Sequence, residues 1–334
     1  MIDLHLHLDG SLSKEDFIVL ARKENIQLGP DFPHSIYVSD DCPSLEDYLR
    51  RFDLPLKLLQ SPENLTFVTR SLVIRLASMG FIYAEIRFAP LLHTQAGMSQ
   101  CQAVQAAIDG LKEGLHMTKG FDANLILCCM RHASEKENLQ TIEMANEFAH
   151  HKVVAVDLAG AEALHPGSYY KKIYDRAKRY HLNITIHSGE ATGSDEVMMA
   201  LDNGAKRIGH GVHLSLDEKT ISRVIKSGVC FEFCPTSNLQ TKSLKTYQEV
   251  PLRQFMSHGI PVTINSDNMT VSHTDAIREM AEMVKAFNLN KDEVYQLLST
   301  SVKYAFVSRY KKHYLTKQLN KSFDSYYQKV SSKN

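Results

Sequence analysis

Residues 1–12 read MIDLHLHLDGSL. In the first eight positions apolar residues alternate with Asp3, His5 and His7, which is the two-residue period of a β-strand. His5 and His7 are two positions apart, so their side chains point to the same face of this strand, and Asp9 follows at its carboxyl end. The stretch predicts a strand that ends in a cluster of polar side chains.

Similar short apolar runs recur along the chain. Longer segments with apolar residues at helical spacing lie between them, such as Lys14–Lys23 and Ser99–Met117. This alternation predicts a parallel α/β architecture, and the number of runs favours a (β/α)8 TIM barrel over an open sheet. The eight predicted strands are Ile2–Leu8, Ile82–Phe88, Ala123–Met130, Val153–Leu158, Leu182–His187, Arg207–His210, Val229–Cys234 and Pro261–Asn265.

Polar residues stand at the carboxyl ends of these runs. In a (β/α)8 barrel the carboxyl ends converge on one face, where the active site is built, whereas an open sheet gathers only some of them. We therefore expect residues far apart in the sequence to share one pocket. The residues concerned are His5, His7, Asp9, Arg87, Arg131, Asp157, Gly160, His187 to Glu190, His210, Asn238 and Asp267.

The composition limits the possible partners. The chain has 334 residues with 38 Lys and Arg against 38 Asp and Glu, which argues against a nucleic-acid interface built on a broad basic face. No apolar stretch is long enough to span a membrane, and residues 1–5 lack the features of a secretion signal. We expect a cytoplasmic protein of unknown oligomeric state, with one domain over residues 1–310 and a lysine-rich helical tail over residues 311–334.

Several common catalytic motifs are absent from the sequence. It contains no G-x-G-x-x-G, no P-loop, no G-x-S-x-G and no H-E-x-x-H. It also lacks the P-C-x-x-C half of the cytidine-deaminase zinc signature, and its six cysteines form no C-x-x-C pair. These absences weaken the case for dinucleotide binding, phosphoryl transfer by a P-loop, esterase chemistry and zincin proteolysis.

The histidines at the strand ends are candidate metal ligands. An H-x-H pair alone is a weak signal, because two histidines near a strand end are often satisfied by hydrogen bonds. His187 and Asp267, after the fifth and eighth predicted strands, strengthen it. Three imidazoles and one carboxylate suit one zinc ion, with a further position open to water.

Glu190 and His210 are candidates for proton transfer at such a site. Glu190 follows His187 by three residues and can reach the same pocket, where an apolar wall would favour its acid form. His210, between two glycines, is the candidate that orients or deprotonates water. From spacing alone, Glu190 could equally be a solvated glutamate at a helix start. His210 could equally be a histidine that is hydrogen-bonded within a glycine turn.

Seven segments in order resemble the adenosine deaminase family, in its bacterial form. The resemblance extends over about the first 300 residues and has many ordered motifs, so it is highly specific. The segments are MIDLHLHLDGSL (1–12), YAEIRFAP (83–90), VDLAG (156–160), HSGE (187–190), RIGHG (207–211), CPTSNLQT (234–241) and TINSDN (263–268).

The resemblance implies a single-zinc (β/α)8 barrel that hydrolyses adenosine, and also 2′-deoxyadenosine, to inosine or deoxyinosine and ammonia. It implies zinc ligation by His5, His7, His187 and Asp267, with Asp267 also counted among the catalytic residues. Glu190 would protonate purine N1 and His210 would orient the water. Asp9 would meet the ribose 5′-hydroxyl, His7 would border the sugar, and the Gly160 N–H would meet purine N3.

Two segments qualify this resemblance. Residues 44–65 are similar to the helical flap that covers the nucleoside, although their apolar residues also suit an ordinary buried helix face. Many relatives have two consecutive acids after the eighth strand, where this chain has Asp267-Asn268. Because purine N7 is an acceptor and an amide carries donor N–H groups, we expect Asn268 to keep the N7 contact.

Two other substrates and one function without catalysis are the alternatives to adenosine deamination. Free adenine is the nearest rival substrate, although Asp9 as a ribose partner and the 234–238 motif favour adenosine. AMP fits less well, because a carboxylate at position 9 would repel a 5′-phosphate. A barrel that binds a nucleoside without turnover is a distant alternative, since the four expected ligands, Glu190 and His210 are all present.

Overall fold

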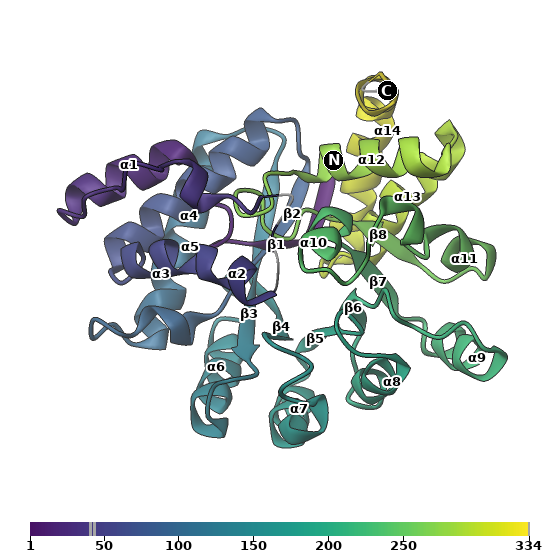
Figure 1. Cartoon of the computed structure of the whole chain (residues 1–334), viewed down its shortest axis with the longest axis horizontal. Coiled ribbons are helices and arrows are strands. Elements are labelled where there is room, and N and C mark those ends of the chain that lie inside the picture. The colour runs from purple at the N-terminus through teal and green to yellow at the C-terminus, as the bar shows by residue number, and fades with distance from the viewer. Residues whose placement is uncertain (40–41, 43–44, 333–334) are drawn as a thin grey trace.

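The computed structural model of the chain describes residues 1–39, 42 and 45–332. Ser44, at the start of the expected flap, and residues 333–334 of the expected tail lie outside the described residues. Figure 1 shows the strands at the centre of the molecule with helices around them. Among the described helices, none is long and apolar enough to cross a membrane.

Eight parallel strands in the described chain follow one another in sequence order around the sheet. The (β/α)8 barrel predicted from the sequence is confirmed. Most strand residues are buried on both faces, which explains why the runs read as nearly continuous apolar segments. The strands are β1 (Ile2–His7), β2 (Tyr83–Phe88), β3 (Asp122–Met130), β4 (Val153–Ala159), β5 (Asn183–Ser188), β6 (Arg207–His210), β7 (Cys230–Phe233) and β8 (Val262–Ile264).

The helices follow the strands and cover the barrel. Several begin at capping boxes, as at Ser13, Ser99 and Ser134, where a side chain accepts an otherwise free N–H of the first turn. The helices are α1 (Lys14–Lys23), α2 (Leu45–Leu49), α3 (Asp53–Leu58), α4 (Pro62–Ser78), α5 (Gln100–Met117), α6 (Glu135–Glu147), α7 (Lys171–Arg179), α8 (Ser194–Asp202), α9 (Glu218–Ser227), α10 (Pro235–Gln240), α11 (Leu252–Ser257), α12 (Ala276–Phe287), α13 (Lys291–Tyr304) and α14 (Arg309–Ser331).

The barrel closes between β1 and the segment after β8. The His7 N–H donates to the Asp267 carbonyl at 2.7 Å, and the Asp267 N–H donates to the His5 carbonyl at 2.8 Å. Deeper in the same seam, the Leu4 N–H donates to the Asn265 side-chain oxygen at 3.0 Å. The closure therefore brings His5, His7 and Asp267 together although about 260 residues separate them in the sequence.

Candidate active site

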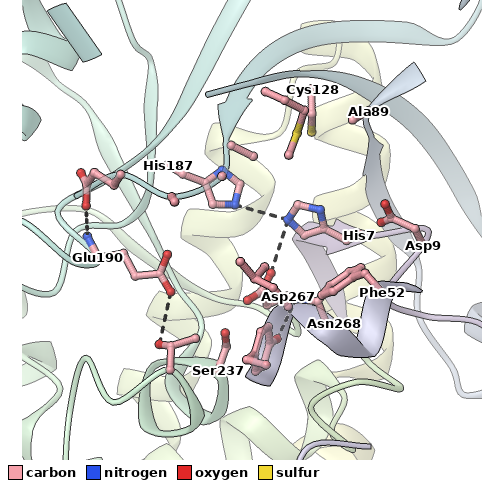
Figure 2. A pocket seen from close by; sticks show the side chains of 18 of the residues that line it. His7, Asp9, Phe52, Ala89, Cys128, His187, Glu190, Ser237, Asp267 and Asn268 are labelled. Carbon is pink, nitrogen blue, oxygen red and sulfur yellow. Dashed lines mark hydrogen bonds and ion pairs between the residues drawn. The ribbon is translucent and has the colours of Figure 1, made fainter. Parts of the chain in front are cut away.

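A cavity of about 300 Å³ opens at the carboxyl ends of the strands. Figure 2 shows His187 and Glu190 on one side of it, with His7, Asp9 and Asp267 on the other. Residues of α2 and α3 and of the turn between them also line it, namely Tyr48, Leu49, Phe52, Asp53 and Leu56. The cavity thus lies between the strand ends and a helical segment.

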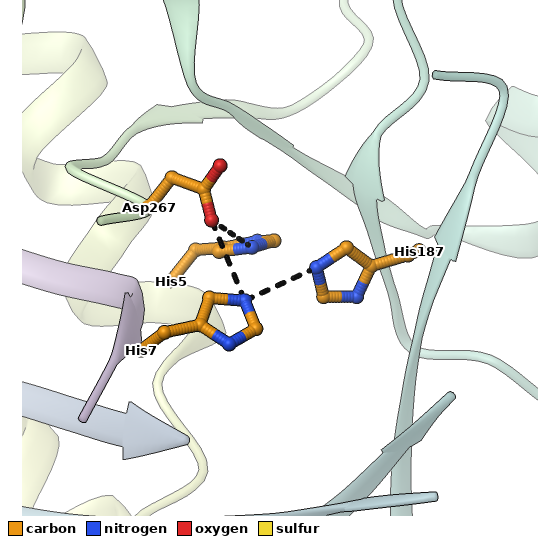
Figure 3. A group of neighbouring side chains, drawn as sticks. All are labelled: His5, His7, His187 and Asp267. Atoms are coloured by element: carbon orange, nitrogen blue, oxygen red, sulfur yellow. Dashed lines mark hydrogen bonds and ion pairs between the residues drawn. The ribbon is translucent and has the colours of Figure 1, made fainter. Parts of the chain in front are cut away.

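Four side chains at the cavity floor form a compact cluster (Figure 3), namely His5, His7, His187 and Asp267. One ligand atom from each lies within 4.8 Å of the others. His7 Nε2 is 3.3 Å from His187 Nε2 and 3.4 Å from Asp267 Oδ1, and His5 Nε2 is also 3.4 Å from that oxygen. Ligands about 2.0–2.1 Å from a tetrahedral zinc ion are roughly 3.3–3.4 Å apart, so these separations fit a zinc-sized ion.

Two carboxylates orient the rings of this cluster from behind. The Nδ1 atoms of His5 and His187 lie 2.9 Å from Glu232 Oε2 and Asp157 Oδ2 respectively. A proton on Nδ1 that is held by a carboxylate leaves Nε2 with its lone pair free, which is the tautomer that binds a metal. The His5 Nε2 is buried and has no hydrogen-bond partner, as expected of a ligand atom.

Arg87 joins the two orienting carboxylates. Its guanidinium donates to Asp157 and to Glu232, each at 2.8 Å, and all three side chains are fully buried. Burial alone would raise the pKa of both carboxyls. His187 and Arg87 beside Asp157, and Arg87 and Arg207 beside Glu232, instead hold both pKa values well below their usual range. Both groups are therefore carboxylates at neutral pH. Glu232 hydrogen-bonds to His5 Nδ1, and Asp157 lies at ion-pair distance from His187 Nδ1.

The remaining ligands of the cluster also suit a metal. Burial lowers the pKa of His7 well below its ordinary value, so the ring is neutral and can donate a lone pair.

Asp267 and His210 both have left-handed backbone conformations, with φ of 59° and 64°. Such conformations cost about 1–3 kcal/mol at non-glycine residues and persist where the surrounding structure enforces them.

A second cluster, formed by His210, Cys234 and Asp267, overlaps the first at Asp267. Burial, followed by the charge of Asp267, raises the pKa of Cys234 well above its usual value. Because the thiolate rather than the thiol binds metals, the second cluster is a poorer metal site than the first.

Glu190 and His210 face each other across the cavity wall. His210 Nε2 is 3.6 Å from Glu190 Oε2, and His210 Nδ1 is 3.2 Å from the amide nitrogen of Asn238. The Thr241 hydroxyl donates to Glu190 Oε1 at 3.4 Å. The side-chain contacts of Glu190 are thus long, while its backbone N–H donates to the Glu162 carboxylate at 3.1 Å.

The other residues expected at the substrate site also line the cavity. Asp9 Oδ1 is buried without a partner, and burial raises the pKa of this carboxyl to about 6. Gly160 has a φ of 104°, a conformation that requires glycine. Asn268 donates its side-chain N–H to the Tyr48 hydroxyl at 2.9 Å, and its Oδ1 has no partner.

The sequence predicted that all the polar strand-end residues would share the pocket, and for seven of them this is wrong. His5, which belongs to the ligand cluster, does not line the cavity, and neither do Ser188 and Gly189. Arg87, Arg131, Asp157 and Asn238 are buried but do not line the cavity. They hydrogen-bond behind it instead, and the Arg131 guanidinium, for example, donates to the His187 carbonyl at 2.8 Å. Long side chains at strand ends can turn into the barrel wherever a buried carboxylate or carbonyl accepts their protons.

Sequence reasoning missed three residues of the site. Glu162 and Glu232 were not singled out, and Tyr48 was included only within the flap segment. Glu162 had a usable signal, since it is two residues after Gly160 in a strand-end motif. Glu232 lies inside a strand and Tyr48 inside a helix, so for these two residues no motif marked a role.

The family model described as Adenosine deaminase matches residues 1–322. The adenosine deaminase of Haemophilus ducreyi is 46% identical over 316 residues, which cover 92% of each chain. The chain belongs to the adenosine deaminase family. This confirms the membership predicted from the seven motifs and makes the protein an enzyme of the deaminase class.

Solved structures of other deaminases resemble the chain throughout its length. Adenine deaminase from Arthrobacter aurescens has a TM-score of 0.87 at 25% identity and covers 96% of this chain and 98% of its own. Arabidopsis ADAL complexed with IMP has a TM-score of 0.86 at 26% identity and covers 97% of both chains. Members with this fold thus differ in the purine compound named for them.

Proposed function

We propose that this protein is a zinc-dependent adenosine deaminase that converts adenosine, and also 2′-deoxyadenosine, to inosine or deoxyinosine with release of ammonia. The observation that carries the proposal is the metal-sized cluster of three imidazoles and one carboxylate, with Glu190 and His210 beside it. Its substrate is a small purine nucleoside, with neither nucleic acid nor membrane as a partner.

One zinc ion per chain would be held by His5, His7, His187 and Asp267. The mutual separations of these ligand atoms and the carboxylates behind His5 and His187 support this assignment. When bound, zinc supplies Lewis acidity that lowers the pKa of water to about 7. The residues around the cluster then have to position the purine and move protons.

Glu190 and His210 carry the proton transfers. Glu190 gives a proton to purine N1 while the oxygen of water forms a bond to C6, and His210 orients that water and accepts its proton. This proton then reaches the departing amino group, the C6–N bond breaks and ammonia leaves. The remaining hydroxyl proton returns to the Glu190 carboxylate as the C6 carbonyl of the product forms. Protonation of N1 offsets the charge that builds up when the ring loses aromaticity.

The substrate would be oriented by groups that line the cavity. The free Oδ1 of Asp9 accepts from the ribose 5′-hydroxyl, with His7 at the edge of the sugar. The Gly160 N–H donates to purine N3, and the second N–H of Asn268 donates to N7 while the first is engaged by Tyr48. A buried polar group that lacks a partner is costly, and a bound nucleoside would satisfy Asp9 Oδ1.

The helical segment over the cavity would act as a cover for the nucleoside. Tyr48, Phe52 and Leu56 line the cavity from α2, from α3 and from the turn between them. The Tyr48 hydroxyl also contacts Ser272 Oγ at 2.9 Å. This contact and the hydrogen bond from Asn268 to Tyr48 tie the described part of the 44–65 segment to the region after β8. The segment would thus exclude water once substrate is bound.

Free adenine is the second candidate substrate, because an adenine deaminase is among the structures that the chain resembles. Two observations favour the nucleoside. Asp9 offers an oxygen that adenine cannot use, and the higher identity, 46%, is to a protein named adenosine deaminase. AMP is disfavoured because its 5′-phosphate would meet the same carboxylate.

The test is to mix the purified protein separately with adenosine, adenine and AMP and to follow the ultraviolet change on loss of the 6-amino group. We expect conversion of adenosine, with about one zinc ion per chain. Preferential conversion of adenine would overturn the sugar contacts of Asp9 and His7, and no conversion of any of the three by the metal-loaded protein would overturn the proposed reaction.

The Asn268 contact has its own test. Asn268→Ala should raise the KM for adenosine or lower kcat, since a hydrogen bond to purine N7 is lost. The matched substrate is 7-deazaadenosine, in which a C–H replaces N7, and on this substrate the variant and the wild type should be alike. If Asn268→Ala leaves both constants for adenosine unchanged, the contact with N7 is wrong.

A further inference from the structure

The carboxylate of Glu162, in the loop after β4, accepts four consecutive backbone N–H groups of the loop after β5. Glu162 itself is only 4% exposed. Its Oε1 takes the first N–H and its Oε2 takes the other three. The donors are Gly189, Glu190, Ala191 and Thr192, at 2.6, 3.1, 2.9 and 3.1 Å.

Consecutive N–H groups that converge in this way form an anion-binding concavity, or nest. The left-handed conformation of Gly189, with a φ of 70°, lets the chain turn its amides inward. Here the anion is supplied by the protein itself. An ionised carboxylate has about four acceptor positions, so one side chain can satisfy the whole nest, including the buried N–H of Gly189, which would be costly to leave unpaired.

Glu190, the proposed acid, lies inside this nest and depends on it for its position. Its own carboxyl has only long contacts, 3.4 Å to Thr241 and 3.6 Å to His210. The location of that carboxyl is therefore set mainly by its backbone. At the start of the same segment, Arg131 holds the His187 carbonyl at 2.8 Å, so the nest and this arginine hold the segment from both ends.

We infer that Glu162 is a positioning residue that fixes the backbone of Glu190, so that the Glu190 carboxyl can deliver its proton to the bound purine. This inference rests on the proposed function and extends it to a residue that is not one of the four proposed metal ligands and has no assigned contact with the purine. A misplacement of about 1 Å at a reacting group can cost roughly 10²-fold in rate, so loss of the nest anion should appear mainly in kcat.

The first variant is Glu162→Gln, which keeps the shape of the side chain. Its amide NH2 would face N–H donors instead of accepting them, so part of the nest is lost. We expect kcat for adenosine to fall about 10–100-fold, with KM within about threefold of wild type because the purine contacts are elsewhere. All turnover is expressed per folded, metal-loaded chain, so that any loss of fold or metal is not counted as lost catalysis.

Chemical rescue separates positioning from a general structural role. Glu162→Ala leaves the nest without an anion, and Glu162 lines the cavity, so a small carboxylate can enter from the substrate side. Added formate or acetate should raise the kcat of Glu162→Ala at least tenfold over its value without the added carboxylate. Glu162→Gln should not respond, because its side chain still fills the space.

The control is Glu293→Gln. Glu293 also accepts a backbone N–H, that of Asn290 at 2.8 Å, at the start of α13 and outside the cavity lining. This change should leave kcat and KM unchanged. Formate at the same concentration should likewise have no effect on the wild type.

The inference is overturned if Glu162→Gln and Glu162→Ala turn over adenosine at the wild-type kcat per folded chain. It is also overturned if Glu162→Ala loses kcat and neither formate nor acetate restores it. A failure of the proposed function is distinguishable, because wild type would then be inactive on adenosine in the same assay. If wild type is active and Glu190→Gln is not, the results for Glu162 decide the inference alone.

Discussion

The floor and the wall of the cavity differ in how their buried polar groups are satisfied. In the floor, beneath the ligand cluster, Glu232 and Asp157 each contact Arg87 and a histidine Nδ1. In the wall, Asp9 and Asn268 each keep one oxygen without a partner and form no ion pair with a described residue, whereas Asp157 in the floor, whose Oδ1 is also unpartnered, is ion-paired through Oδ2. Both regions are buried at the same end of the barrel, so burial alone does not explain the difference.

The contrast separates support from recognition. A buried ion pair that is well bonded holds its members in one geometry, which is what ligand rings require. The unpaired buried acceptor of Asp9 costs free energy in the free protein, and this cost is recovered when the ribose hydroxyl donates to it, whereas Asn268 would contact the purine through its second N–H. Floor variants should therefore change metal affinity and stability, whereas wall variants should change kcat or KM at normal stability.

The largest effect is expected from Glu190→Gln in the wall. General acid catalysis contributes about 10²–10⁴-fold, so kcat for adenosine should fall by that factor while metal content stays at the wild-type level. Asp267→Ala is the contrasting variant, because it should lose the metal together with turnover. Near-normal turnover in Glu190→Gln would remove this residue from the chemistry and make the wall a binding surface only.

Arg87→Met tests the floor. Removal of the guanidinium leaves Asp157 and Glu232 buried without their shared cation, which should cost about 3–5 kcal/mol in the free energy of unfolding. Because two ligand rings lose their fixed partners, metal affinity should fall about 10–100-fold. Urea unfolding and competition with a chelator measure the two effects.

The control for this variant is Arg70→Met. Arg70 pairs with Glu113 at 2.7 Å, but both side chains are more than a third exposed, so the expected change is below about 1 kcal/mol. Equal effects from the two arginine variants would contradict the supporting role of the floor.

A smaller effect, confined to one part of the substrate, is expected from Asp9→Ala. Loss of a hydrogen bond to a charged acceptor costs about 1.5–3 kcal/mol, so kcat/KM for adenosine should fall by roughly 10–100-fold. The matched substrate is 5′-deoxyadenosine, which has no 5′-hydroxyl. Wild type should prefer adenosine over it, and Asp9→Ala should not distinguish the two. A preference that survives the substitution assigns the hydroxyl to another group.

Glu279 on α12 sharpens the comparison, because it is a buried carboxyl bonded only by neutral donors. It accepts from the Thr236 N–H at 3.0 Å and the Thr274 hydroxyl at 2.7 Å. Burial, with a smaller contribution from Asp275, raises its pKa from 4.5 to about 7. The arginine-paired carboxyls of the floor shift in the opposite direction.

The raised pKa predicts the sign of a pH effect. Between pH 4.5 and about 7 the folded state binds a proton at Glu279 that the unfolded state releases. Its stabilisation is therefore fully present below pH 4.5 and is lost as pH rises through 7, by at most about 3 kcal/mol. Glu279→Gln cannot titrate, so wild type minus variant stability should decrease from pH 5 to pH 8 in urea unfolding. A constant or increasing difference would contradict the raised pKa.

Most of the fold could be predicted from the sequence. Each end of the eight predicted strands lies within one residue of the strand observed in the described chain. Parallel strands buried on both faces must be nearly continuous apolar runs, and Arg207–His210 was even located at its observed bounds. The side-chain period also indicated that His5 and His7 share a face, which the structure shows beside Asp267.

By itself, then, the sequence determined the barrel, the family, and which side chains stand at the carboxyl ends of the strands, because period and motif order are local properties of the chain. Only the tertiary structure decided that Arg87 turns beneath the ligands to Glu232, 145 residues away, and that Glu162 fills the nest around Glu190. A buried polar group takes whichever partner the closed barrel brings within about 3 Å, and sequence spacing does not specify that partner.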